Sequence, residues 1–323
     1  MTRSAKSRES SITRDQSVNQ AFQTILRQNF QVMTGWEPVA YHRSDIEGVH
    51  QVRVALRRMR SALVVFRRAL PRTLTDPMGD AMRWAAGELG AARDLDVFIS
   101  EGLDLMAGRM PLDAEIRKLR ARAMAAQEVA YGQVRALLDS GRYRSFRDSF
   151  GAWVEQGAWY QQDLPGPVRA RLMDPVPGFA VRALDKHHDR VLASGAPLST
   201  MGANQLHELR IECKKLRYAV EFFAPLFDAE GMGRYTGYLK GLQGVLGTIN
   251  DVSLLPGLLE RLVGDQADPD LIRCAGATLG WRSREAEQAR VGLAKQWKAF
   301  SRAGTPWRSP VGEETVPMNL QVS

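Results

Sequence analysis

The sequence contains one helical pattern twice, and this repeat restricts the possible folds more than any other feature. Residues 49–66 read VHQVRVALRRMRSALVVF, and residues 206–223 read LHELRIECKKLRYAVEFF. His50 aligns with His207, a separation of 157 positions, and the same separation holds without insertion as far as Asp94 and Asp251. Agreement at one offset in two separate segments indicates two copies of one structural unit. We therefore predict two tandem helical bundles that arose by internal duplication and are related by a pseudo-twofold axis.

Both copies have the apolar spacing of amphipathic helices. Apolar residues recur three and four positions apart, as in Val52, Leu56 and Met59, whereas alternating runs of Val, Ile and Thr are scarce. The predicted fold class is therefore all-α. The expected helices span residues 17–32, 46–70, 76–108, 113–140 and 143–161 in the first copy, and 167–194, 204–227, 233–262 and 270–301 in the second.

Prolines mark the boundary between the copies. Pro165, Pro167, Pro175 and Pro177 crowd one short segment, and proline punctuates helices. The predicted organisation is a mobile N-terminus at 1–14, a first helical repeat at 15–162, a proline-rich linker at 163–178, a second helical repeat at 179–302 and a mobile C-terminal tail at 303–323.

The composition indicates a basic globular protein. Its 44 Lys and Arg residues outnumber 36 Asp and Glu residues, giving a net charge of +8, and such a surface attracts nucleic acid, anionic membrane or polyphosphate. A hydrophobic content of 44% excludes a chain disordered throughout, and no apolar run approaches the ~20 residues of a membrane helix. With only Cys213 and Cys274 and no visible secretory signal, we expect a cytoplasmic protein without disulfides or membrane insertion.

One face of each duplicated helix is basic. The stripe in the first copy consists of His50, Arg53, Arg57 and Arg60, and the stripe in the second consists of His207, Arg210, Lys214 and Arg217. A solvated helix face usually alternates signs, because opposite charges three or four positions apart attract each other. From Val49 to Thr75, however, the chain has seven arginines and no acidic residue. We interpret the unrelieved repulsion as the mark of an anion-binding face.

The start of the first stripe strengthens this interpretation. Ser44 and Glu47 have the spacing of a capping box, which would place His50 and Arg53 in the first turns of the helix. Cations there face the positive end of the helix dipole, and helix N-termini attract phosphate.

Neighbouring residues are expected to complete or support the face. Arg83 and Lys240, equivalent in the two copies, should approach the stripes, whereas Arg58 and Lys215 point away and are secondary.

Repeated glycines and aspartates are predicted to be structural. No strand precedes Gly87 or Gly244, so a phosphate-gripping loop is disfavoured and close helix packing is expected. Asp94 and Asp251 are expected to cap a helix or to pair with an arginine.

The sequence supports neither catalysis nor a metal site. A metal-dependent phosphohydrolase needs clustered carboxylates, and the stripes have almost none. No second ligand stands at zinc spacing beside His50 or His207. His187 and His188 are adjacent, point to different helix faces and are expected on the surface. No catalytic residue, metal ion or cofactor is predicted.

These motifs resemble the conserved histidine α-helical domain (CHAD) family. The resemblance rests on His50-x-x-Arg53 with Arg57-Arg58-x-Arg60, on His207-x-x-Arg210 with Lys214-Lys215-x-Arg217, and on residues 89–97. It extends over residues 15–302, although Asn250 stands where the first copy has Arg93. The resemblance implies two helical bundles around a basic groove that binds inorganic polyphosphate, in a binding module rather than a catalyst. It also implies association with polyphosphate or polyhydroxyalkanoate granules.

The leading hypothesis is non-catalytic binding of polyphosphate in a basic cavity between the two stripes. Nucleic-acid binding is a first alternative that shares the charge but lacks zinc-finger spacing and interleaved stacking aromatics, so sequence-specific recognition is not expected. The second alternative is an enzyme that processes polyphosphate. The third is an adaptor whose stripes hold acidic protein partners.

Overall fold

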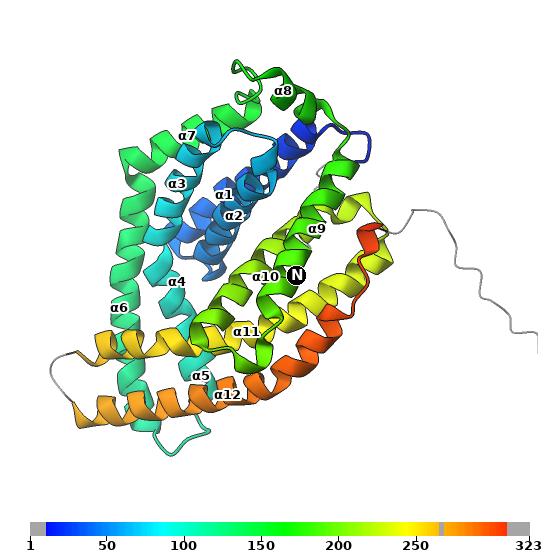
Figure 1. Cartoon of the computed structure of the whole chain (residues 1–323). Coiled ribbons are helices and arrows are strands. Elements are labelled where there is room, and N and C mark those ends of the chain that lie inside the picture. The colour runs from blue at the N-terminus through cyan, green and yellow to red at the C-terminus, as the bar shows by residue number, and fades with distance from the viewer. Residues whose placement is uncertain (1–10, 265–267, 309–323) are drawn as a thin grey trace, which may run out of the picture.

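The described part of the molecule, residues 11–264 and 268–308 of a computed structural model, is built from helices and contains no strand (Figure 1). An isolated bridge between Ser17 and Pro175 is the β-type pairing recorded in this part. The all-α fold class predicted from the apolar spacing is therefore confirmed.

The first half contains helices from α1 to α7. They are α1 (Val18–His42), α2 (Glu47–Val65), the 3₁₀ turn η1 (Phe66–Arg68), α3 (Arg72–Glu88), α4 (Gly90–Val97), a π-helical turn (Phe98–Leu103), α5 (Asp104–Met106), α6 (Asp113–Asp139) and α7 (Gly141–Glu155).

The second half continues from α8 to α12. Its elements are α8 (Gly166–Met173), α9 (Val176–Gly195), the turn η3 (Leu198–Thr200), α10 (Ala203–Phe223), the turn η4 (Ala224–Leu226), α11 (Ala229–Val263), α12 (Pro269–Ser301) and the turn η5 (Pro306–Arg308).

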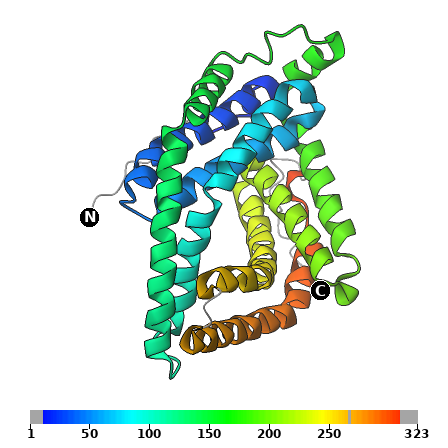
Figure 2. The ribbon, with the colours of Figure 1, turned by 90° about the vertical axis from the view of Figure 1, so that its left-hand side faces the viewer.

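The two halves contact each other in the middle of the molecule and at both ends. Helices α2 and α10 pack against each other in the middle of the molecule, and α8 and α9 contact α1 at one end. At the other end α11 and α12 extend across to α6 (Figures 1 and 2). Because α2 and α10 carry the two basic stripes, their packing brings the stripes into the same region.

An aromatic cluster fixes the position of α2 relative to α10. Phe66 and Phe223, which are equivalent in the repeat, have ring centroids 5.8 Å apart, and Phe179 of α9 stacks on Phe66 at 4.9 Å. All three rings are buried, so this cluster belongs to the core shared by both halves. The meeting of two equivalent residues agrees with a pseudo-twofold arrangement, while the duplication itself stays a prediction.

Several helix boundaries differ from the predicted ones because of tertiary packing. The first helix extends past residue 32 to His42 and includes Pro38, because Met33 and Ala40 are fully buried in its second part. A Cβ on Gly48 would lie 2.5 Å from the backbone nitrogen of Ala40, so the close approach of α1 and α2 requires glycine there. The predicted helix at 76–108 is interrupted after Glu88.

The proline-rich linker is partly helical and is attached to the first half. It contains α8, and α9 already begins at Val176. The Val18 amide donates to the Asp174 carbonyl at 2.9 Å, and the Val176 amide donates to the Gln16 carbonyl at 3.0 Å. This segment therefore clamps the beginning of α1.

The described parts of both chain ends pack against the helices, although the sequence predicted mobile tails. Near the N-terminus, Ile12 is buried and Arg14 donates to the Leu226 carbonyl at 2.7 Å. Near the C-terminus, the buried Trp307 donates its indole N–H to Asp185 at 2.8 Å. Residues 1–10 and 309–323 lie outside the described residues, and their predicted mobility stays a prediction.

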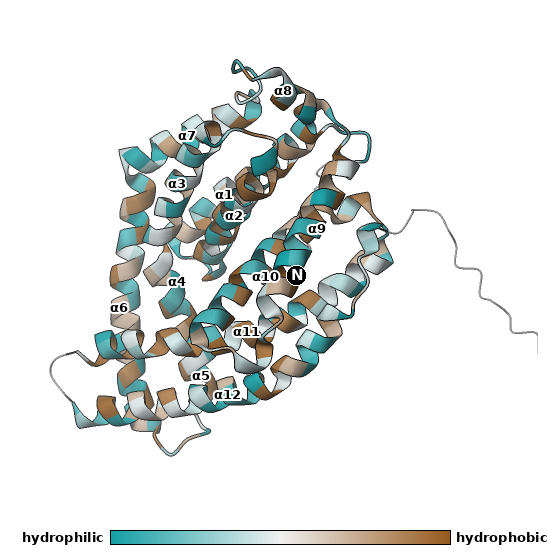
Figure 3. Ribbon diagram, in the orientation of Figure 1, coloured by the Kyte–Doolittle hydropathy of each residue, from teal (hydrophilic) through white to brown (hydrophobic). Residues whose placement is uncertain are grey.

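The helices combine hydrophilic and hydrophobic residues along their length, as α6, α11 and α12 illustrate (Figure 3). Within residues 11–264 and 268–308, none has both the length and the apolar character needed to cross a bilayer.

Candidate functional site

Helix α2 presents the first stripe because its opposite side is locked in the core. Val52, Leu56 and Met59 are fully buried, which leaves His50 and the stripe arginines half-buried at the edge of the helix. The predicted capping box is wrong: Ile46 is the N-cap, and Asp45 accepts a hydrogen bond from the Glu47 amide at 2.8 Å. The Asp45 carboxylate satisfies the free N–H that Ser44 was expected to satisfy.

Helix α10 presents the second stripe in the same way. Leu209, Cys213 and Leu216 are fully buried on its apolar side. Burial raises the pKa of Cys213 to about 12, so this thiol is a neutral core group at physiological pH. Arg210, Lys214 and Arg217 are consequently held along the edge that faces α11 and α2.

A shared carboxylate joins the two stripe helices. Glu221 of α10 accepts from Arg58 of α2 at 2.8 Å and lies 3.5 Å from Arg217 on its own helix. All three side chains are about one quarter to one third exposed. Arg58, predicted as secondary, thus contributes to the contact between α2 and α10.

The stripes meet at two adjoining cavities. The α10–α11 cavity, about 350 Å³, is lined by Arg57, Arg210, Lys214, Arg217, Lys240, Gln243, Gly244 and Gly247. The α2–α3 cavity, about 380 Å³, has a lining that includes Arg57, Arg60, Arg67, Arg83, His187, Lys214, Lys215 and Tyr218 together with Asp76 and Asp80. Arg57 and Lys214, which are equivalent in the repeat, line both cavities, so cations from both stripe helices surround these neighbouring cavities.

Several of these cations have no partner of opposite charge. Arg57, Arg60 and Lys214 form no ion pair among the described residues, whereas Arg83 contacts Asp80 at 2.7 Å. Burial, followed by Arg210 and Arg57, lowers the pKa of Lys214 to about 8. Burial and the neighbouring Arg83 also lower the pKa of Arg60. Accumulated positive charge in a partly dehydrated place is costly, and an anion would relieve the cost.

Three predicted residues line neither cavity. Arg53 donates through Nη1 to the Ala86 carbonyl near the end of α3. His50 lies among cations, and burial together with Arg93 lowers its pKa. The ring of His207 donates through Nδ1 to the Asn250 side-chain oxygen at 2.6 Å.

The repeated aspartates stand within helices rather than at their caps. Asp251 lies in α11 and contacts Arg210 at 3.5 Å, which is the arginine partner that the sequence suggested. Asp94 lies in α4, where burial raises its pKa and the charge of Arg53 opposes that rise.

Close helix packing does not explain the repeated glycines. A Cβ added at Gly87 or Gly244 would meet no atom within 4 Å, so the expected role is wrong at these positions. Gly244 instead lines the α10–α11 cavity, where any side chain would take space beside Lys240.

The structure adds two residues that the sequence did not indicate. His187 and Tyr218 are each 2% exposed, line the α2–α3 cavity, and have an Nδ1 atom and a hydroxyl group without a hydrogen-bond partner among the described residues. The expectation that His187 and His188 lie on the surface is wrong, since α9 packs along α10 and both rings are buried. The hydrophobic residues around the histidine pair, Ala183, Leu184 and Val191, could have signalled this burial.

No group of three or more His, Cys, Asp or Glu side chains arranged to hold a metal ion occurs in the part of the chain that the structure describes. The linings of the two cavities supply mainly hydrogen-bond donors and positive charge, with Asp76 and Asp80 as the carboxylates.

Comparisons with known proteins agree with this architecture. A family model described as the CHAD domain matches residues 24–260. The crystal structure of the CHAD domain from the plant Ricinus communis is similar with a TM-score of 0.77 and 24% identity, over 92% of this chain and 96% of that chain. PptA from Streptomyces chartreusis is similar with a TM-score of 0.66 and 16% identity, over 88% of this chain and 100% of that chain. At these identities the two likenesses concern the fold. No curated protein matches the chain.

Proposed function

This chain belongs to the CHAD domain family, and on that premise we propose that it binds inorganic polyphosphate in the cavities between its stripes, without catalysing a reaction. The proposal includes a location in the cytoplasm or on polyphosphate or polyhydroxyalkanoate granules.

The observation that carries the proposal is the position of Arg57 and Lys214. They come from equivalent places in two copies, line both cavities, and have no ion-pair partner among the described residues. Elsewhere in the molecule arginines such as Arg27 and Arg234 contact carboxylates. Unpaired cations around a shared space favour a ligand with many closely spaced negative charges.

The donor set suits repeated phosphates. Arginine presents a planar fork that can bind two phosphate oxygens, and lysine acts as a compact point charge. Beside these cations, the buried Tyr218 hydroxyl and the buried His187 Nδ1 atom lack a hydrogen-bond partner among the described residues. A linear polyphosphate has phosphate oxygens along its whole length, so one chain could contact cations from both copies.

Nucleic acid fits this donor set less well. Binding of single strands relies on exposed aromatic faces against which bases stack. The aromatic rings in the lining of the α2–α3 cavity are those of Tyr218 and His187, and both are 2% exposed. The lining thus offers contacts to phosphate but almost none to bases.

Calorimetric titration with long-chain polyphosphate tests the proposal. Arg57→Ala with Lys214→Ala should weaken binding by about 100-fold, at ~1.4 kcal/mol for each lost charged contact. The matched control is Arg117→Ala with Arg122→Ala, which removes two exposed arginines from α6 and should leave the affinity unchanged. Unchanged binding in the stripe variant would contradict the proposal.

Competition separates the alternatives. Polyphosphate should displace a labelled polyphosphate far better than duplex DNA or polyglutamate at equal charge concentration, and affinity should fall steeply with salt. Equal displacement by DNA would favour nucleic-acid binding, and equal displacement by polyglutamate would favour an adaptor for acidic proteins. Release of free phosphate in the presence of Mg²⁺ or Mn²⁺ would favour an enzyme.

A further inference from the structure

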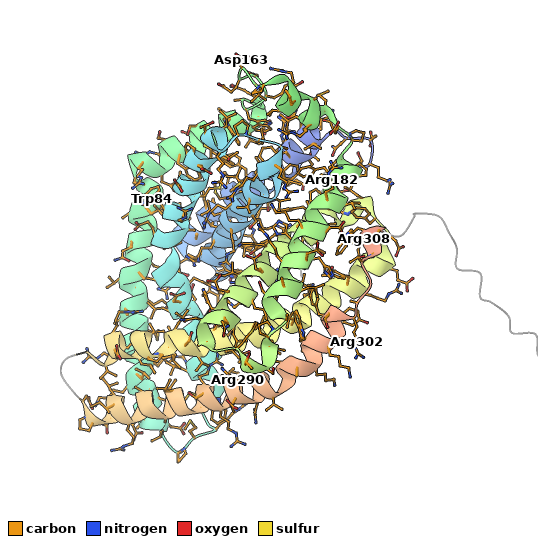
Figure 4. The ribbon with its side chains drawn as sticks, viewed as in Figure 1. Trp84, Asp163, Arg182, Arg290, Arg302 and Arg308 are labelled. Carbon is orange, nitrogen blue, oxygen red and sulfur yellow. The ribbon has the colours of Figure 1, made fainter. Side chains whose placement is uncertain are left out.

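A third basic cavity lies beyond the duplicated stripes. The α8–α9 cavity, about 400 Å³, is formed by the end of α2, the turn η1, and helices α8 and α9. Its charged lining consists of Arg68, Arg171, Arg182 and Lys186, with Asp174 as the carboxylate. Arg182 lies on the part of α9 that is nearest to α8 (Figure 4). The four cations outnumber the carboxylate, so the cavity is positive.

These cations also lack partners. Arg68, Arg171, Arg182 and Lys186 form no ion pair among the described residues. Burial, followed by the like charges of Arg68, Arg190 and Arg67, lowers the pKa of Lys186. The third cavity therefore has the same electrostatic character as the two cavities between the stripes.

The third cavity adjoins the α2–α3 cavity. Val65 and His187 line both cavities and form the wall between them. The exposed Arg67 and Arg68 are consecutive in η1, and Arg67 lines one cavity while Arg68 lines the other. A flexible chain of phosphates could thus pass over η1 with a cation on each side of the wall.

The wall between the α2–α3 and α8–α9 cavities contains a buried polar atom without a hydrogen-bond partner among the described residues. The Nδ1 atom of His187 is buried without a hydrogen-bond partner among the described residues, in a ring that is 2% exposed and lines both cavities. An unpaired buried polar group costs free energy, so a ligand atom that reached it would bind more favourably. This observation is independent of the surface charge.

We propose that the polyphosphate site extends over η1 into the α8–α9 cavity, where Arg171, Arg182 and Lys186 bind the distal part of a long chain. This inference rests on the proposed function and adds a chain-length preference to it. Tripolyphosphate is short and binds only in the cavities between the stripes, whereas a longer chain also occupies the third cavity. The residues involved come from α8 and α9, outside the helices that carry the repeated His and Arg motifs.

The test compares two ligands and two double variants by calorimetric titration. Arg171→Ala with Arg182→Ala should bind long-chain polyphosphate about tenfold more weakly, a total of ~1.4 kcal/mol, or ~0.7 kcal/mol for each of two contacts made by exposed side chains. Its affinity for tripolyphosphate should stay unchanged. The slope of log affinity against log salt for the long chain should shrink by about 1.4, at ~0.7 for each lost contact on a single-stranded polyanion. Both arginines are exposed, and thermal melts verify that the fold is retained.

Any different result overturns the inference, and the results distinguish a failure of the extended site from a failure of the proposed function. Unaltered long-chain affinity, or equal weakening for both ligands, removes the extended site but leaves the proposed function standing. Two tripolyphosphate sites in the unaltered protein, one of them lost in the variant, would assign the cavity to a separate small anion. Failure of the unaltered protein to bind either ligand overturns the proposed function as well. The control Arg117→Ala with Arg122→Ala should match the unaltered protein with both ligands.

Discussion

Helices α2 and α10 carry equivalent stripes, yet the protein holds the two stripes differently. In the second copy, Asn250 binds His207 and Asp251 contacts Arg210. In the first copy, position 93 is an arginine rather than the equivalent of Asn250, so His50 faces an additional cation. The difference teaches that two cations of the second stripe, Arg210 and Arg217, contact carboxylates, whereas the arginines of the first stripe form no ion pair among the described residues.

The elements after the stripes differ as well. In the first copy α3 ends at Glu88 and α4 begins at Gly90, whereas α11 runs without a break from Ala229 to Val263. Arg53 donates to a carbonyl near this break, while its counterpart Arg210 contacts a side-chain carboxylate. Equivalent arginines thus stabilise different features, and this contrast can be measured.

The largest expected effect is on stability at this pair. Arg53→Ala should lower the free energy of unfolding by ~1–3 kcal/mol, because the half-buried Ala86 carbonyl loses a charged donor at a helix end. Arg210→Ala should cost only ~0.2–1 kcal/mol, because the Asp251 side chain is 52% exposed and water can replace the arginine. Urea unfolding of both variants measures the difference. Equal losses would show that the two arginines are structurally equivalent.

The second expected effect is a pH dependence of binding that originates in one copy. Lys214, the counterpart of Arg57, has a pKa lowered to about 8 by burial and nearby arginines. A lysine, unlike an arginine, loses its charge near such a value. Polyphosphate affinity should therefore fall by about tenfold between pH 7 and pH 9.5, which is one lost charged contact. Calorimetric titration across this range provides the measurement, and Lys214→Arg should remove the pH dependence. A variant that keeps the full dependence would assign it to another group.

Lys214 should also affect the pH dependence of stability in the ligand-free protein. Its pKa is about 8 in the folded protein, against 10.5 for an unperturbed lysine, so the unfolded state binds more protons between these two values. The contribution of Lys214 to the free energy of unfolding should therefore rise as pH increases from 8 to 10.5, and below pH 8 its cost is fully present. Urea unfolding of Lys214→Arg should lack this rise. An identical pH profile in both proteins would contradict the assignment.

The sequence predicted those features that depend on local spacing. The apolar side of α2, with Leu56 and Met59 in the core, and the cations beside it follow from one helical period. The repeat offset aligns Arg57 with Lys214, and both residues line the same two cavities. Such features need no knowledge of which helices become neighbours.

The remaining features depend on contacts between distant segments. The Arg53 contact with Ala86 joins two helices through residues 33 positions apart, so local spacing did not reveal it. His187 was expected on the surface, and only the packing of α9 along α10 buries it. The α8–α9 cavity joins three separate segments, so its cations form no pattern along the sequence.

A smaller effect is expected for Arg58 and Lys215, where one substitution should alter mainly stability and the other mainly binding. Arg58 pairs with Glu221 across the two copies, whereas Lys215 pairs with Glu212 on its own helix and lines the α2–α3 cavity. Arg58→Ala should cost ~0.2–1 kcal/mol of stability and leave polyphosphate affinity unchanged. Lys215→Ala should cost less stability, at ~0.3–0.5 kcal/mol for a pair within one helix, but should weaken binding two- to threefold, or ~0.5 kcal/mol. Thermal melts and calorimetric titration would reveal a reversed pattern if these assignments are wrong.

The smallest expected effect concerns the histidine that opens the first stripe. Burial lowers the pKa of His50, and Arg93, Arg57 and Arg53 lower it further, while Glu47 acts in the opposite direction. Arg93→Asn introduces the residue found at the equivalent place in the second copy and removes the strongest of these like charges. The pKa of His50 should therefore rise, and its ring-proton signals should titrate at higher pH in NMR spectra.

Arg93→Asn should also change how the free energy of unfolding depends on pH. A histidine whose folded pKa lies below its unfolded value binds fewer protons in the folded state, so it destabilises the fold progressively as pH falls through that window. Raising the pKa of His50 reduces this loss, and Arg93→Asn should resist mild acid better than the unaltered protein. Arg117→Asn, which removes an exposed charge from α6, is the control and should leave the titration of His50 in place. An unmoved His50 titration in Arg93→Asn would show that burial alone sets its pKa, and that the extra cation of the first copy does not reach the ring.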